Sequence, residues 1–532
     1  MKRFLLIPVL ALCLLLSGCG GRESPAQAPE EPPSEAHVQE FGEVEIARPD
    51  VSGAFSVRDI EGSYDEAAAI KIDLSGESAV CNEGAVSISG STVTIRNEGV
   101  YILSGSLQGC IVVDAADTDK VQLVLSGAEI SSLDGAAISV RQADKVFITL
   151  AEGTENTLSS SGGFEGAEDN IDAAVFSRDD LTINGAGALS VSSPYGNGIS
   201  SKDELTICGG SLTVTAAKHA LEANDSAAIC AGSLALSAGE DAVHCENEEE
   251  SGLGWVYISG GSFDIQAGDD GIHASGALLI EGGDIRISRC NEGIEGKTVE
   301  ISGGNIQITA GDDGINAADG SSAGGFGGSA GCAVLISGGS IDITADGDGI
   351  DSNGFFSVSG GDIHIAGANY GDSSIIDYET TGSYTGGIVF GTGAASMAEN
   401  FSQAKNGGCI MLTVGSHSAG AEISLADADG NVLLSGTADR DFSCVIIASA
   451  DISAGETYSL SIDGELTEIN MDSAIYGSGS FGGFGGGYPG FGGGPQGTPP
   501  DMDNAPGTPP DMGGDNQGMP PDMGARPENP RR

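Results

Sequence analysis

Residues 258–272 read Ile-Ser-Gly-Gly-Ser-Phe-Asp-Ile-Gln-Ala-Gly-Asp-Asp-Gly-Ile, and residues 301–315 read Ile-Ser-Gly-Gly-Asn-Ile-Gln-Ile-Thr-Ala-Gly-Asp-Asp-Gly-Ile. Both stretches belong to a longer repeat. Most of its members are 21 or 22 residues apart, and insertions within 247–255 and 318–331 explain the two longer spacings. Alignment on the first isoleucine brings these residues to one position: Ile207, Ile229, Ile258, Ile280, Ile301, Ile336 and Val358. A fixed period of this size indicates a solenoid.

The pattern inside each repeat indicates strands. Apolar and polar residues alternate over short runs that glycines interrupt, and no repeat contains a helix-length amphipathic run. The 86 glycines among 532 residues fit a chain that turns several times per repeat. The Leu-x-x-Leu-x-Leu signature of leucine-rich repeats is missing. The sequence therefore predicts an all-β parallel β-helix with coils of about 22 residues, whose inward columns become a core only by stacking.

Stacking converts a repeated acid into a column of charge. Equivalent residues of neighbouring coils lie about 4.8 Å apart. At an effective dielectric near 20, unit charges at that spacing repel by about 3 kcal/mol per pair, so something must neutralise them in a marginally stable fold. In the register of Asp270, five consecutive members are acidic, and the column reads Asn197, His219, Asp241, Asp270, Glu292, Asp313 and Asp348.

Two flanking columns add oxygen ligands. One contains Glu240, Asp269, Asn291 and Asp312, and the other contains Glu222, His244, His273, Glu295, Asn316 and Asp351. Clustered carboxylate and amide oxygens suit hard cations, calcium best of all. A single Asp-Gly is ordinary turn chemistry, but five acids in phase favour bound cations. We therefore expect calcium as the cofactor, with these ligands: Asp241, Asp269, Asp270, Glu292, Asp312, Asp313, Asp348 and Asp351.

The first 60 residues indicate export. A basic start and a short apolar run end at Leu16-Ser-Gly-Cys19, so residues 1–19 resemble a lipoprotein signal peptide with a lipobox. An ordinary signal peptide with an incidental cysteine is the alternative. Lipidation of Cys19 would anchor the chain to a bacterial membrane outside the cytoplasm. Residues 20–60 are rich in Pro, Glu, Ala and Ser, and we expect a disordered tether there.

The remaining sequence divides into three parts. The β-helix is expected over residues 61–385. Residues 386–468 contain short apolar runs without the 22-residue frame, which predicts an antiparallel β cap that protects the end of the solenoid. Residues 469–532 are rich in Gly and Phe and then repeat Pro-Pro-Asp-Met, so we expect a disordered tail.

Cysteines give a weaker signal. Nine follow Cys19, an odd number that predicts no complete disulfide framework. Cys208 and Cys230 occupy the same position in successive coils, so they either form a bridge or stack as small apolar residues. We expect stacking. The absence of a Cys-x-x-Cys pair argues against structural zinc.

The charge balance restricts the partners. The formal net charge is −56, from 77 acidic and 21 basic residues. Nucleic acid is therefore excluded as a natural partner. Anionic polymers would also be repelled unless bound cations reverse the local sign of the charge.

The coils at 259–272, 302–315 and, more loosely, 337–350 resemble a family of secreted bacterial carbohydrate-binding proteins, which are distantly similar to pectate lyases. The phrases Ser402-Gln403, Asp427-Ala-Asp-Gly430 and Phe442-Ser-Cys-Val-Ile-Ile447 are also similar. The resemblance covers roughly residues 65–468. It implies a right-handed parallel β-helix, calcium at the Asp-Asp-Gly columns and binding of cellulose-like or acidic, pectin-like polysaccharide. Asn291-Glu292, Gly347 and Lys218-His219 depart from the pattern at their coils.

Three functions compete on this basis. The first is a polysaccharide-binding module on the cell surface, and we favour it. The second is a calcium-dependent polysaccharide lyase, which needs a basic side chain beside the metal to remove a proton. Its candidates are Lys218, Arg286, Arg289 and Lys297, whose alternative role is salt bridging along an acidic solenoid. The third is a structural adhesin. No catalytic residue is assigned.

Aromatic side chains are the expected sugar contacts, because sugar faces stack on flat rings. Trp255, the single tryptophan, ends an insertion between coils and is the first candidate. Packing of this side chain against the mouth of the coil is an equal alternative. Tyr195 and Tyr370 are the next candidates.

Overall fold

The computed structural model describes residues 37–41, 44–81, 84–164, 170–247, 249–320, 331–371 and 373–477. These residues belong to a single compact unit that spans residues 1–481. Within them the fold is all-β with one short helix, α1 (Val57–Glu61), which confirms the predicted class. The described residues contain no helix of the length and hydropathy needed to span a membrane. Cys19, the lipobox and the Pro-Pro-Asp-Met repeats lie outside the described residues.

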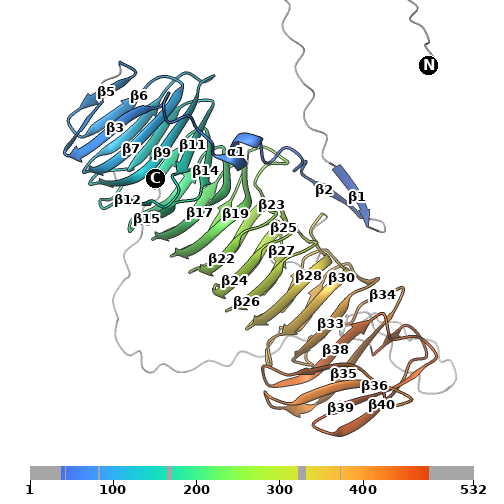
Figure 1. The fold of residues 1–532 in the computed structure, drawn as a ribbon. Helices are drawn as coiled ribbons and strands as arrows, with labels where there is room; N and C mark the ends of the chain where they lie inside the picture. The colour runs from blue at the N-terminus through green and yellow to red at the C-terminus, as the bar shows by residue number, and fades with distance from the viewer. Residues whose placement is uncertain are drawn as a thin grey trace, which may run out of the picture. The chain divides into compact units, whose positions relative to one another are not determined.

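The strands form three stacked faces (Figure 1). On the first face, neighbouring strands pair in parallel from β3 (Ile70–Gly76) through β7 (Gly99–Leu107), β9 (Lys120–Ser132), β11 (Lys145–Leu150), β14 (Asp180–Gly185), β17 (Glu204–Ala216), β19 (Ser226–Ala238), β21 (Trp255–Ile258), β23 (Ile272–Ile280), β25 (Ile294–Ile301), β28 (Ala333–Ala345), β30 (Phe355–Ala366) and β32 (Thr381–Tyr384) to β34 (Gln403–Ala404).

The second face contains the later parts of β9, β17, β19, β28 and β30 together with β12 (Glu155–Ser160), β15 (Ala188–Ser193), β22 (Ser262–Gln266), β24 (Asp284–Arg289), β26 (Asn305–Ala310) and β33 (Ile388–Gly393). The third face contains the first parts of β23 and β25 together with β6 (Thr92–Ile95), β8 (Cys110–Asp114), β10 (Ile138–Gln142), β13 (Ala173–Ser177), β16 (Asn197–Ser201), β18 (Leu221–Ala223), β20 (Val243–Cys245), β27 (Ile315–Ala317), β29 (Ile350–Ser352) and β31 (Ile376–Tyr378). Two short strands, β4 (Ser78–Val80) and β5 (Val86–Ser89), form antiparallel hairpins with β3 and β6.

The strand register follows the sequence repeat. Each residue aligned on the isoleucine pairs with its successor, from Ile207 with Ile229 to Ile336 with Val358. Each coil therefore pairs with the coil one repeat later, and the inward side chains form one apolar cluster that extends from Ile72 to Ala448.

The Ser-Gly-Gly motif makes the corner between the first and second faces. Its second glycine has a positive φ in successive coils, for example 104° at Gly261 and 95° at Gly304. A side chain would be strained in this conformation. At Gly304 a Cβ would also lie about 3.1 Å from the carbonyl oxygen of Gly283 in the preceding coil. The glycines are thus needed for coils to turn at stacking distance.

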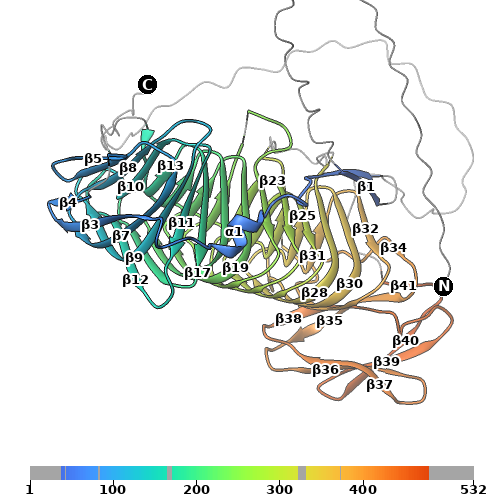
Figure 2. The same cartoon turned by 45° about the horizontal axis from the view of Figure 1, so that its top comes forward.

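The cap shares its first strand with the coils. Strand β33 pairs parallel with β30 and antiparallel with β38 (Phe442–Ser449), which also pairs antiparallel with β35 (Gly408–His417). Beyond these lies a separate antiparallel sheet (Figure 2), formed by β37 (Val432–Thr437), β36 (Glu422–Asp427), β39 (Thr457–Ile462) and β40 (Glu465–Asn470), and β41 (Ile475–Tyr476) adds to β35. The parallel stacking thus continues past residue 385, the predicted end of the β-helix.

The predicted tether at 20–60 is wrong for its second half. Strands β1 (His37–Phe41) and β2 (Val44–Arg48) form a hairpin, and the N-cap of α1, Ser56, forms a capping box with Asp59. The Asp59 carboxylate is 1% exposed, accepts a hydrogen bond of 2.6 Å from Thr182 and lies 3.2 Å from the Lys145 ammonium. Composition suggested a tether, but a capped helix with a buried ion pair ties this segment to the coils.

Removing one inward isoleucine should open a cavity that the neighbouring coils cannot close. Ile301 is fully buried between Ile280 and Ile336. We expect Ile301→Ala to lower the free energy of unfolding by about 2–5 kcal/mol. Ile388→Ala is the matched control, because Ile388 is 38% exposed. Equal losses for the two variants in denaturant titrations would contradict a core built from these columns.

Candidate functional site

The predicted metal ligands gather at the corner between the second and third faces. Strand pairing aligns Val243, Ile272, Ile294, Ile315 and Ile350, each two residues after a member of the acidic column. We call this region the acid corner and define it as Asp241, Asp269, Asp270, Glu292, Asp312, Asp313, Asp348 and, at the start of the third face, Asp351. The sequence repeat predicted this juxtaposition correctly.

The side chains of the column also hold the coils together, which the sequence analysis missed. One side-chain oxygen accepts a hydrogen bond from the backbone N–H of the equivalent residue in the next coil. Asp270 N donates to Asp241 Oδ1 at 2.8 Å, and Asp348 N donates to Asp313 Oδ1 at 2.6 Å. His219 N donates to Asn197 Oδ1 at 3.1 Å, so an amide serves equally well. In the aspartates Asp241, Asp270 and Asp313 the ladder uses one carboxylate oxygen, so the other oxygen can take a different partner.

Histidines pair with carboxylates in the N-terminal part of the acid corner. His219 and His244 place ring nitrogens 3.3 and 2.7 Å from Asp241 Oδ2, and their rings stack with centroids 4.0 Å apart. Burial alone would raise the pKa of Asp241, but these two histidines hold it well below its ordinary value. Burial disfavours charge on His273, yet its partners Asp270 and Glu295 raise its pKa to about 10.

The C-terminal part has no such compensation. Burial and the neighbouring carboxylates raise the pKa of Asp313 to about 7, that of Asp348 to about 8 and that of Asp351 to about 7. Burial and Glu295 raise the pKa of Glu292 to about 8. No described basic side chain makes an ion pair within 4.0 Å with any of these four carboxylates. The flanking column that contains Glu295, Asn316 and Asp351 continues to Asp377, beyond the clear sequence repeat, whereas Ser374 follows Asp348 in the main column.

Three local features fit a cation. Asn316 Oδ1 is buried, has no hydrogen-bond partner among the described residues, and lies on a side chain whose amide donates to Glu292 at 2.9 Å. The Oδ1 atoms of Asp312 and Asp313 both point to the place that a side chain at Gly347 would fill. One oxygen each of Asp241, Asp269 and Asp270 lie within 4.8 Å of one another. Converging carboxylate and amide oxygens are the ligands that calcium takes.

Two exposed tyrosines flank the acid corner. Tyr195 lies in the turn before β16, two residues ahead of Asn197, and is 62% exposed. Tyr370 lies in the turn before β31, four residues ahead of Ser374, and is 72% exposed. Seven coil-to-coil steps of about 4.8 Å separate the two turns, a run of about 34 Å. The structure therefore places two of the three predicted sugar contacts, Tyr195 and Tyr370, at the same corner as the predicted metal ligands.

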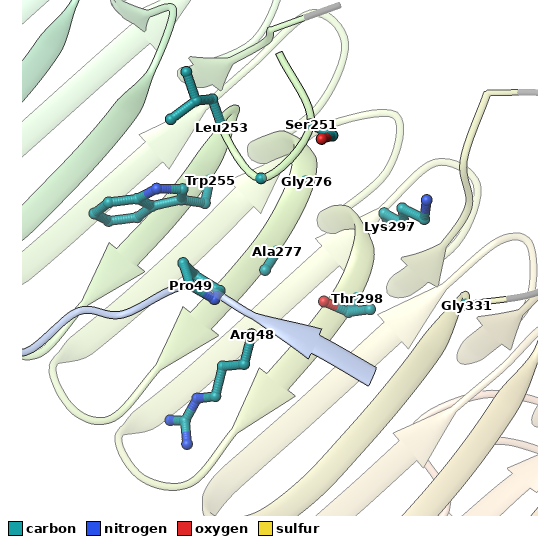
Figure 3. A pocket seen from close by; sticks show the side chains of 11 residues that line it. Arg48, Pro49, Ser251, Leu253, Trp255, Gly276, Ala277, Lys297, Thr298 and Gly331 are labelled. Atoms are coloured by element: carbon teal, nitrogen blue, oxygen red, sulfur yellow. The ribbon is translucent and has the colours of Figure 1, made fainter. Parts of the chain in front are cut away.

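Trp255 lies at a different corner, between the third and first faces. Its half-buried indole lines a pocket of about 280 Å³ with Leu253 and Lys297 (Figure 3). Arg48 and Pro49 complete the pocket, and Arg48 makes ion pairs of 3.5 and 3.3 Å with Glu281 and Glu300. Sequence analysis missed Arg48 and Pro49 because they lie in the predicted tether.

The four candidate lyase bases are scattered. Lys218 precedes His219 and Arg289 precedes Cys290, so both lie near the acid corner. Arg286 lies on the second face and donates to Gln307 at 3.3 Å, and Lys297 lies at the Trp255 pocket. None of the four makes an ion pair within 4.0 Å with a described carboxylate, so salt bridging, their expected alternative role, is not seen. Only Lys218 and Arg289 are placed for proton transfer beside the acidic column.

Comparison with known proteins identifies the family. A family model described as carbohydrate-binding domain-containing protein matches residues 89–292 and 270–398, more than half of the chain. The chain belongs to this family. A carbohydrate-binding domain-containing protein of Acetivibrio thermocellus is 39% identical over 139 residues, which are 25% of this chain and 49% of that protein. The chain thus spans about half the length of this relative.

A solved structure is also similar. It is the polysaccharide lyase-like protein from C. thermocellum, determined as a gadolinium derivative, with 33% identity, a TM-score of 0.40, and coverage of 48% of this chain and 97% of that chain. In this chain the family match contains every residue of the acid corner, both tyrosines and Trp255. The carbohydrate-binding family region is therefore the part of the chain that carries the candidate site.

Replacing one acid of the column by its amide should separate the effect of charge repulsion on stability from the effect of the hydrogen bond between coils. Asp313→Asn keeps the acceptor for Asp348 N–H, as Asn197 does at the start of the column, but removes one charge. In chelator we expect the variant to be more stable than the parent chain, by on the order of 1 kcal/mol. We expect calcium to stabilise the variant less than it stabilises the parent chain.

The control for this variant is Asp264→Asn, an exposed acid on the second face outside the column. This control should change neither the stability in chelator nor the stabilisation by calcium. Thermal unfolding with calcium and with chelator measures both. Loss of stability in chelator for Asp313→Asn would contradict a destabilising charge column.

The metal-free chain should lose stability as pH rises from about 4 to about 8. The raised pKa values of Glu292, Asp313, Asp348 and Asp351 mean that the folded state holds protons that the unfolded state releases in this range. Rising pH therefore favours unfolding, and His273 acts in the same direction above its ordinary pKa of 6.5. We expect the melting temperature in chelator to fall across this range and calcium to flatten the fall. A melting temperature that rises with pH in chelator would refute this expectation.

Proposed function

We propose that this protein is a bacterial cell-surface lipoprotein that binds polysaccharide along a calcium-loaded acid corner. Its stacked coils would form a right-handed parallel β-helix, the architecture that the sequence resemblance implies. Anchoring through Cys19 rests on the Leu16–Cys19 lipobox. Binding, rather than catalysis, is the favoured activity, and a polysaccharide is the favoured partner because the chain belongs to a carbohydrate-binding domain family.

The observation that carries this proposal is the uncompensated part of the acid corner. Four half-buried carboxyls there have raised pKa values and no described cationic partner, while histidines pair with the acids of the other part. Repulsion within such a column destabilises the folded state unless a bound cation offsets it. The residues that would hold calcium are Asp269, Asp270, Glu292, Asp312, Asp313, Asn316, Asp348 and Asp351.

Calcium, when bound, supplies positive charge that attracts the carboxylates of an acidic polymer to a surface of otherwise negative charge. The chain's own residues would set the length of polymer that is bound and its orientation on the surface. Tyr195 and Tyr370 present exposed rings near the two ends of the column, and a ring stacks on the apolar face of a sugar. A linear polymer laid along the corner would contact both tyrosines.

Charge and stacking support different polymers. An acidic, pectin-like chain uses the cation column, whereas a neutral, cellulose-like chain uses the aromatic rings alone. Calcium dependence therefore distinguishes the two. Trp255 lies at another corner and cannot contact the same run of polymer, so the two tyrosines replace it as the leading candidates. Its pocket of about 280 Å³ is a separate contact for a single sugar unit.

The test is retention of the chain on insoluble polygalacturonate and on cellulose, with calcium or with chelator. We expect calcium-dependent retention on polygalacturonate. The double variant Tyr195→Ala/Tyr370→Ala should weaken it about tenfold, from two lost stacking contacts, without a change in melting temperature. Tyr64→Ala is the matched control, since Tyr64 is 37% exposed but lies before the first coil.

Other outcomes point elsewhere. Unsaturated sugar ends in the supernatant would make the protein a lyase and direct attention to Lys218 and Arg289. Absence of retention on both polymers would contradict the binding proposal and favour a structural adhesin. Retention that neither calcium nor the tyrosines affect would move the site to the Trp255 pocket.

A further inference from the structure

Two cysteines occupy the corner between the first and second faces in adjacent coils. Cys208 and Cys230 stand at the position after Ile207 and Ile229, which pair with each other in β17 and β19. In four later coils the same position holds a serine, namely Ser259, Ser302, Ser337 and Ser359. The chain thus replaces serine by cysteine in two consecutive coils.

The two sulfur atoms are in closer contact than separate thiols allow. Cys208 Sγ lies 2.7 Å from Cys230 Sγ. Non-bonded heavy atoms prefer separations of about 3.5–4.0 Å, whereas a disulfide has sulfurs about 2.05 Å apart and Cα atoms about 4.4–6.8 Å apart. The strand register shifts here, so that Cys208 pairs with Ala231 and Cys230 is the adjacent residue on the neighbouring strand. A small rotation of either side chain would bring the sulfurs to bonding distance.

One cysteine of the pair, Cys230, is partly exposed, where an oxidant can reach it. Cys208 is 6% exposed, and Cys230 is half-buried at the surface of the corner. Most of the other described cysteines are buried, for example Cys245 and Cys409, which are both fully covered. Among the described residues this is the pair whose sulfur atoms are in contact.

We propose that Cys208 and Cys230 form a disulfide that links two consecutive coils. One thiolate attacks a disulfide donor, such as oxidised glutathione, and forms a mixed disulfide as the first donor thiol leaves. The second thiolate then attacks the protein sulfur of that mixed disulfide, the Cys208–Cys230 bond forms, and the second donor thiol leaves. The two cysteines are oxidised, the donor is reduced to two thiols, and the cysteine protons pass to the leaving thiolates.

The bond would fix the coil at the start of the acid corner. The loop that it closes, residues 208–230, contains Lys218 and His219, and His219 contacts Asp241 of the next coil. The disulfide would therefore hold the coil of His219 in register with the coil of Asp241, the first acid of the column. This proposal does not depend on polysaccharide or calcium binding. It replaces the expectation that the two cysteines only stack as small apolar residues. That expectation rested on their positions in the repeat and not on the contact between their sulfur atoms.

The test is mass spectrometry of the full chain after incubation with oxidised glutathione, alkylation of free thiols and trypsin digestion without reductant. Cleavage after Lys202, Lys218 and Arg286 gives peptides 203–218 and 219–286. We expect a linked pair whose mass is about 2 Da below the sum of the two peptides, and reductant should separate it. Cys208→Ser and Cys230→Ser should each abolish it, and serine is the residue that other coils use at this position.

Cys245 lies in the same peptide as Cys230, so Cys245→Ala serves as the matched control and should leave the linked pair intact. Alkylation of both Cys208 and Cys230 in the folded, oxidant-treated chain would overturn the proposal. So would a linked pair that persists in Cys230→Ser, because the partner would then be Cys245. These outcomes are independent of whether the chain is retained on polysaccharide.

Discussion

The structure depends on the spacing between stacked strands. Coils that pair in parallel place equivalent residues about 4.8 Å apart, so any residue that the sequence repeats becomes a continuous column. Isoleucine columns become the core, and glycine columns become the corner where the chain turns. The same spacing makes an acidic column costly, since neighbouring charges repel along its length. The spacing between stacked strands therefore determines both the packing of the coils and the charge repulsion at the acid corner.

The chain handles this repulsion in two ways. In the N-terminal part, His219, His244 and His273 stand among the acids, stack on one another and pair with Asp241, Asp270 and Glu295. In the C-terminal part, acids follow one another from Glu292 to Asp348, Asp351 and Asp377 stand in the flanking column, and burial raises the pKa of Asp348, Asp351 and Asp377. The proposed calcium would offset the repulsion in that part. The backbone ladder explains why Asn and His can replace Asp at some coils without disturbing the stack.

Sequence periodicity predicted much of this arrangement. The residue-by-residue alignment on Ile258 agreed with the strand register, and the acidic register followed from it. Three features were not predicted, for physical reasons. The capped helix at Ser56–Gly62 was masked by a polar composition, although its Ser and Asp at the start and Gly at the end are helix signals. The ladder and the Cys208–Cys230 contact depend on side-chain directions that periodicity does not specify. Trp255 and the two tyrosines were predicted together as sugar contacts, but they lie at different corners of the coils.

The central claim is that cations occupy the acid corner of the folded chain. The most direct measurement is a crystal structure of the chain grown with calcium, with anomalous scattering used to locate the ions. The account predicts peaks between the levels of Asp270 and Asp348, with oxygen ligands at about 2.3–2.6 Å, and with Asn316 Oδ1 or the space at Gly347 facing an ion. Carboxyl groups in contact with one another or with water alone, without an anomalous peak, would contradict it.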